Sequence, residues 1–61
     1  IWFSAVVINT YNALLDRGIN FDITNATKWI KMAEGELNSK KDEFQYRKKE
    51  ILDLKTRVKL N

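Results

Sequence analysis

The chain carries an unbroken heptad pattern from residue 23 to residue 58, in which mostly apolar side chains recur at alternating intervals of three and four. On a helix this spacing forms one continuous stripe, which is typical of the seam of a coiled coil. With Ile23 taken as an a position, the a and d positions hold Ile23, Ala26, Ile30, Ala33, Leu37, Lys40, Phe44, Arg47, Ile51, Leu54 and Val58. A long helix with such a stripe is unstable alone in water, so the sequence predicts association.

The composition favours an all-helical chain that needs a partner. The 61 residues include no cysteine, histidine or proline and only two glycines, Gly18 and Gly35. A chain of this size buries little surface, and without a disulfide it usually gains stability from oligomerisation. The first residue is Ile1 rather than methionine, from which we expect a segment of a longer protein. The sequence therefore predicts a single oligomerisation module over residues 1–61.

Two helices joined by one turn account for the whole chain. We expect a first helix over residues 1–17, a turn over 18–22 in which Gly18 adopts the left-handed conformation, and one long coiled-coil helix over 23–60. Asp22 is the best candidate for the N-cap of the second helix. No signal that would end this helix precedes its last residues.

The first helix presents two apolar faces. At 100° per residue, one broad face is expected to pack on the second helix, where Trp29 and Met32 provide the receiving surface; it consists of Phe3, Val7, Ile8, Tyr11, Leu14 and Leu15. A narrower strip contains Trp2, Val6 and Ala13. This strip could meet another chain, or the helix could be buried on most sides in a longer protein.

Helix lengths predict a partner in trans. The first helix spans ~25 Å and the second ~57 Å, so the first covers the second only as far as about Lys40. The large side chains beyond that point would stay exposed at a cost of about 1.5–3 kcal/mol each. We therefore expect a dimer whose N-terminal half is a four-helix head and whose C-terminal half is a two-stranded coil.

Charges beside the seam favour a parallel homodimer. Glutamates occupy g positions and lysines the following e positions, which predicts the interchain pairs Glu36 with Lys41, Glu43 with Lys48 and Glu50 with Lys55. The charged d residues Lys40 and Arg47 weaken the middle of the coil and disfavour other registers. An antiparallel or tetrameric bundle is the alternative assembly.

No catalytic constellation can be built from these residues. With neither cysteine nor histidine, the chain offers no nucleophile paired with a base, no zinc ligand set and no phosphate loop, so the sequence predicts a non-enzymatic protein without metal or cofactor. Nucleic-acid binding through the basic residues of the second helix is an alternative function, although acidic residues interrupt them. The short apolar run in the first helix argues against a membrane span, and the lack of cysteine and of a signal peptide favours an intracellular location.

Overall fold

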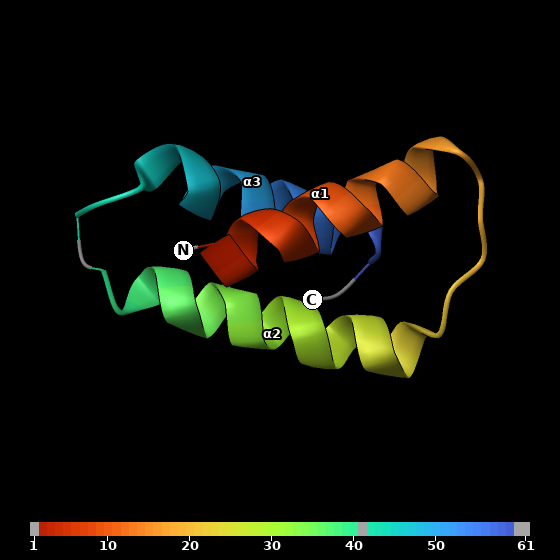
Figure 1. Ribbon diagram of the computed structural model, residues 1–61, viewed down its shortest axis with the longest axis horizontal. Helices are drawn as coiled ribbons and strands as arrows, with labels where there is room; N and C mark the ends of the chain where they lie inside the picture. The colour runs from red at the N-terminus through yellow and green to blue at the C-terminus, as the bar shows by residue number, and fades with distance from the viewer. Residues whose placement is uncertain (1, 41, 60–61) are drawn as a thin grey trace.

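Three helices make up the fold. The computed structural model describes residues 2–40 and 42–59, and within these ranges the chain forms α1 (Trp2–Asp16), α2 (Ile23–Asn38) and α3 (Gln45–Arg57), with no strand. Figure 1 shows α1 and α3 on the same side of α2 and running along it, and each helix contacts the other two. The predicted all-α class is confirmed, as a three-helix bundle with extents of 33 × 19 × 19 Å.

The core is formed by one apolar stripe from each helix. The buried apolar residues are Val7, Ile8, Ala26, Ile30, Ala33, Leu37, Ile51, Leu54 and Val58. Ala26 and Ala33 are fully buried on α2, and their small side chains let the neighbouring helices approach closely. Seven of the eleven seam residues are thus buried against helices of the same chain.

The turn between α1 and α2 forms where the sequence predicts it. Gly18 has a φ of +66°, and the N–H groups of Gly18 and Ile19 donate to the carbonyls of Leu15 and Leu14. This is the hydrogen-bond pattern of a Schellman motif, which closes a helix. Asp22 then caps α2, since its carboxylate accepts a hydrogen bond of 2.9 Å from the backbone N–H of Thr24.

The expected helix over residues 23–60 is divided into two. α2 ends at Asn38, and α3 begins only at Gln45 and folds back along α2. The N–H of Ser39 bonds to carbonyls of the last turn of α2, and Phe44 enters α3 with a φ of 58° in the left-handed region. Residues 39–44 contain no glycine or proline, so the sequence carried no obvious signal for this turn.

Burial explains why the chain accepts this turn. A left-handed conformation at a residue such as Phe44 costs roughly 1–2 kcal/mol. Folding back buries Ile51, Leu54 and Val58 against α1 and α2, and each large apolar side chain removed from water contributes about 1.5–3 kcal/mol. In this fold, α1 and α2 of the same chain therefore cover the side chains of Ile51, Leu54 and Val58, which the sequence analysis assigned to a second chain.

The two glycines should respond oppositely to alanine. Gly35 lies inside α2 with open space around it, so Gly35→Ala should stabilise the fold by about 0.5–1 kcal/mol. Gly18→Ala should destabilise it by ~1 kcal/mol or more, because alanine is strained at a φ of +66°. Urea unfolding of the two variants measures both changes, and equal signs would contradict the turn geometry described above.

Candidate interaction surface

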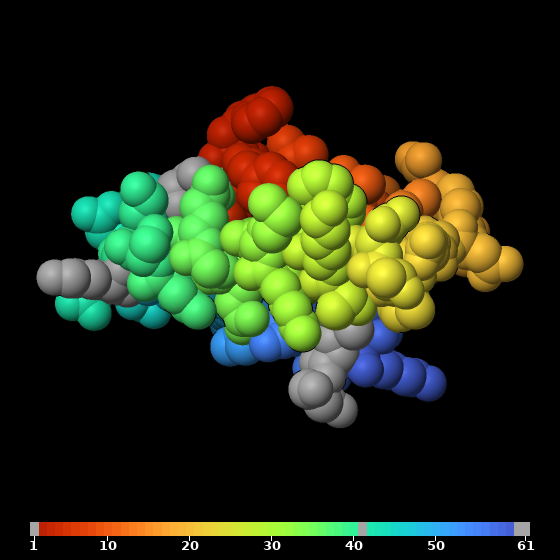
Figure 2. Space-filling view, turned by 90° about the horizontal axis from the view of Figure 1, so that it is seen from below, coloured from red at the N-terminus to blue at the C-terminus, as the bar shows by residue number. Residues whose placement is uncertain are grey.

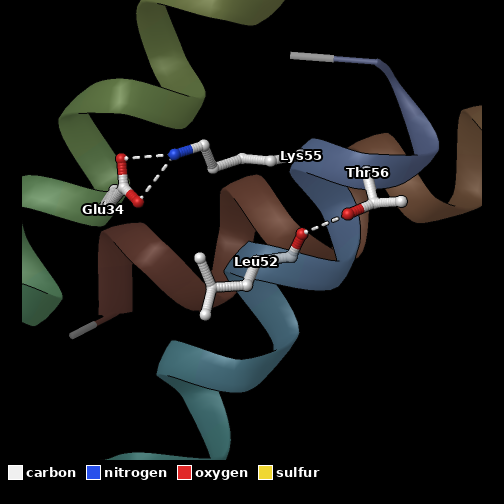
Figure 3. Close-up of polar contacts among 4 residues, drawn as sticks. All are labelled: Glu34, Leu52, Lys55 and Thr56. Carbon is white, nitrogen blue, oxygen red and sulfur yellow. Dashed lines mark hydrogen bonds and ion pairs between the residues drawn. The ribbon is translucent and has the colours of Figure 1, made fainter. Parts of the chain in front are cut away.

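Ion pairs join α3 to each of the other two helices. Between α2 and α3, Nζ of Lys55 lies 2.9 and 3.1 Å from the carboxylate oxygens of Glu34 (Figure 3). Between α1 and α3, the guanidinium of Arg57 donates at 2.7 Å to Oδ1 of Asp16 and at 2.7 Å to Oδ1 of Asn12. These contacts hold α3 to both other helices along its exposed edges.

Part of the third boundary, between α1 and α2, is an apolar groove lined by uncharged side chains. A groove of about 310 Å³ lies there, which we call the α1–α2 groove; its lining residues are Phe3, Val6, Val7, Thr10, Tyr11 and Trp29. The ring centroids of Phe3 and Trp29 are 5.9 Å apart, and those of Tyr11 and Phe21 are 5.1 Å apart in an edge-to-face arrangement. Aromatic contacts of this kind fix the walls of the groove.

Large apolar side chains beside this groove are exposed. Trp2 is 81% exposed at the start of α1, and Val6, Trp29 and Met32 are exposed as well. In Figure 2 the start of α1, in red, projects beyond α2, in green, along their common edge. Nζ of Lys28 lies 5.3 Å from the ring centre of Trp29 and adds positive charge to the rim. Tryptophan and methionine are enriched at protein interfaces and uncommon on inert surfaces.

A buried polar contact closes one end of the α1–α2 boundary. Ser4 is fully buried, and both its backbone N–H and its hydroxyl donate to Oε1 of Glu36, while the hydroxyl also lies 3.0 Å from the carbonyl oxygen of Ala33. The hydrogen bond from the Ser4 hydroxyl lowers the pKa of Glu36 below its ordinary value, and desolvation opposes this shift. The carboxylate thus caps the first turn of α1 from a different helix.

Acid should weaken this contact. Because the pKa of Glu36 is lower in the folded than in the unfolded chain, its contribution to stability is complete above the ordinary glutamate pKa of about 4.3 and is lost as the pH falls through the folded value. We expect Glu36→Gln to flatten the dependence of the unfolding free energy on pH below about 4.3. Urea titrations at a series of acidic pH values test this, and an unchanged slope would contradict it.

The predicted seam residues divide into a buried set and an exposed set. Lys40 is exposed in the α2–α3 turn, and Ile23 is half exposed at the start of α2. Phe44 is partly buried against the core, and Arg47 pairs with Glu50 at 2.8 Å. Of the two charged d positions, Lys40 therefore lies in the turn and Arg47 in the first turn of α3.

The charged residues assigned to interchain pairs have contacts within the chain. Glu50 binds Arg47, Lys55 binds Glu34 and Glu36 binds Ser4. Glu43 is exposed beside the turn, Lys48 is partly buried on α3, and Lys41 lies outside the described residues. Interchain pairing stays a prediction.

The α1 residues expected to pack on the second helix gather at the core and the groove. Val7 and Ile8 are buried; Phe3, Tyr11 and Leu15 pack against the core; and Leu14 is partly buried. Trp29 contacts Phe3, whereas Met32 is half exposed.

Sequence reasoning missed the polar residues that connect the helices, namely Ser4, Asn12, Asp16, Glu34 and Arg57. One signal was available, because Glu34 and Lys55 both occupy e positions of the heptad. In an antiparallel helix pair, unlike a parallel one, e positions face e positions, so this pair indicated that α3 folds back along α2.

The described part of the chain offers neither a metal cluster nor a membrane span. Residues 2–40 and 42–59 contain no cluster of three or more acidic, histidine or cysteine side chains that could hold a metal ion. None of the described helices is both long and apolar enough to cross a membrane. Comparison with protein-family models, with curated proteins and with solved structures found no match.

Proposed function

We propose that this chain is a non-enzymatic interaction module that binds one helix of another protein in the α1–α2 groove. The observation that carries the proposal is the apolar groove between α1 and α2, which is lined by side chains such as Phe3, Val6 and Trp29 and has exposed Trp2 and Met32 near it. Exposed apolar surface of this kind commonly marks a protein–protein contact.

A helix is the occupant that fits this surface best. The groove lies between two antiparallel neighbours, and an additional helix laid along such a groove produces the packing of a four-helix bundle. On α1 the groove lining runs from Phe3 to Tyr11, so the occupant would contact the groove over ~12 Å through apolar residues at positions i, i+4 and i+7.

The charges near the groove favour an occupant with acidic flanks. From Trp2 to Leu15 the first helix has no charged residue. Lys28 lies beside Trp29 at one end of the groove. At the other end, burial and the negative charge of Asp22 raise the pKa of Tyr11, so that end is close to a carboxylate. We therefore propose an amphipathic partner helix with glutamate or aspartate beside its apolar stripe at the Lys28 end, since complementary charge favours the correct orientation and association rate.

The test is a titration with a designed peptide. An amphipathic helical peptide with leucines at i, i+4 and i+7 and flanking glutamates is added, and emission from Trp2 and Trp29 is followed. We expect saturable binding with a blue shift, and no binding by a peptide of the same composition in scrambled order. Val6→Lys should abolish binding because it places a charge in the groove, whereas Leu52→Lys, on exposed α3 surface, should not. Equal binding of both peptides, or equal losses in both variants, would contradict the proposal.

The parallel coiled-coil homodimer with a four-helix head is a second candidate. It requires residues 39–44 to become helical and α3 to leave its own core, because Ile51 and Leu54 cannot face two partners at once. The absence of glycine and proline from this segment supports that possibility. Sedimentation equilibrium over a range of concentrations tests for this dimer. A monomer mass at every concentration would contradict it.

Nucleic-acid binding has less support than either candidate above, because several basic residues are paired within the chain. Arg47, Lys55 and Arg57 already bind carboxylates of the same chain. A titration with duplex DNA tests this alternative, and an affinity that falls steeply with salt would support it.

A further inference from the structure

We propose that two copies of this chain exchange α3, so that α3 of each copy packs on α1 and α2 of the other. The partner is a second copy of this chain, and the surface it occupies is the face on which α3 lies in the closed monomer. This proposal goes beyond binding in the α1–α2 groove, because it concerns the face covered by α3 and does not need the exposed groove residues Val6 and Trp29. Either proposal can therefore fail without the other.

The first argument is the frame of the heptad. Leu37 occupies the last buried a position of α2, and Ile51 and Leu54 occupy a and d positions of α3 in the same frame. In the closed chain the described residues between the helices, 39, 40 and 42–44, lie outside both of them. The closed fold therefore does not require α2 and α3 to share one heptad frame. If these residues become helical, α2 and α3 join into one helix of ~52 Å whose apolar stripe is unbroken.

The second argument is the chemistry of the turn. None of residues 39–44 is a glycine or a proline, so all six can enter a helix. Phe44 has a φ of 58°, which residues other than glycine rarely adopt. Straightening the segment releases Phe44 from this conformation. Short connections under strain favour exchange of an element between copies.

The third argument is that exchange preserves the contacts of α3. Lys55 would bind Glu34 of the second copy, and Arg57 would bind its Asp16, in the geometry that these pairs have in one chain. The joined helices of the two copies would run antiparallel, since α3 is antiparallel to α2. In this antiparallel arrangement g positions face g positions and e positions face e positions, whereas in the parallel dimer g positions face e positions.

The new part of the dimer is the region around residues 39–50. In an antiparallel pair, g positions face g positions, so Glu43 of one copy would approach Glu50 of the other. Like charges at this distance weaken the dimer, and salt screens them. The exchanged dimer should therefore become tighter as ionic strength rises.

Two matched variants test the proposal. Phe44→Ala and Phe44→Gly remove the same ring, but alanine disfavours the left-handed turn and favours helix, whereas glycine does the opposite. Because both turns of a dimer straighten, the dissociation constant should be roughly a thousandfold lower for Phe44→Ala than for Phe44→Gly. Sedimentation equilibrium of the full chain measures it. Equal dissociation constants, or monomers throughout, would overturn the proposal.

Cross-linking distinguishes exchange from any other dimer. The chain has no cysteine, so Glu34→Cys with Lys55→Cys provides the only thiols for a short bismaleimide. When added to the dimer fraction, the reagent should join two chains covalently if α3 has been exchanged. Only intrachain linkage in that fraction would overturn the proposal.

A third variant tests the proposal without altering Phe44, in case the Phe44 variants do not fold. Two glycines inserted between Asp42 and Glu43 lengthen the turn and disfavour helix without removing a packed side chain. This variant should remain folded by circular dichroism and should lose the dimer formed by the unaltered chain. A dimer that survives the insertion would contradict exchange. Val6→Lys should leave the exchanged dimer unchanged, which separates this test from that of the groove.

Discussion

Replacing Leu54 by alanine should lower the free energy of unfolding by about 2–5 kcal/mol, because a buried leucine loses its transfer free energy and leaves a cavity. Leu54 is 0% exposed and packs in the core shared by the three helices. A domain of this length has a typical stability of about 3–9 kcal/mol. The substitution should therefore remove much of the stability and leave a considerable unfolded fraction at ambient temperature.

Leu52→Ala is the matched control for this experiment. Leu52 lies in the same helix and is 55% exposed, so its truncation should change stability by roughly 0.5 kcal/mol or less. Urea unfolding followed by circular dichroism measures both variants. Equal losses would show that α3 does not pack on α1 and α2 through Leu54.

Replacing Ala33 by leucine should lower the free energy of unfolding by about 1–3 kcal/mol, since added methylene groups in a packed core force neighbouring side chains and backbone to shift. Ala33 is 0% exposed, and its carbonyl lies 3.0 Å from the buried hydroxyl of Ser4. The larger side chain has no free volume to enter and should push α1 or α3 away from α2.

Ala13→Leu is the corresponding control. Ala13 is only partly buried on α1, so the same enlargement at this position should have little effect on stability. Thermal unfolding followed by circular dichroism compares the two variants. A stable Ala33→Leu variant would mean that α2 has room at this layer, contrary to the packing described above.

The sequence was informative where a single residue determines the local backbone. Gly18 predicts a left-handed helix end and Asp22 predicts an N-cap, and both lie where the sequence analysis placed them. The apolar stripe also predicts which side chains of α2 avoid water. Leu37 is buried, as a seam residue should be, but its partners belong to the same chain.

The turn at residues 39–44 could not be predicted from the pattern. A heptad stripe predicts which residues are buried against an apolar partner, but it does not predict whether that partner lies in the same chain. Residues 39–44 favour a helix locally, and the burial of Ile51 and Leu54 overrides this preference. The groove was partly predictable, because Trp2 and Val6 form a second apolar strip on α1 and Trp29 was expected to receive the α1 face that contains Phe3, which it contacts.

The contact of Ser4 with Glu36 has a consequence for how α1 forms. The first backbone N–H groups of a helix lack partners within the helix, and in α1 one of these groups, on Ser4, is satisfied by a carboxylate 32 positions further along the chain. A peptide of the α1 sequence alone lacks that carboxylate and is short enough to be largely unstructured in water. Helicity in α1 should thus appear only together with its docking on α2, which makes the folding of the two helices a single cooperative event.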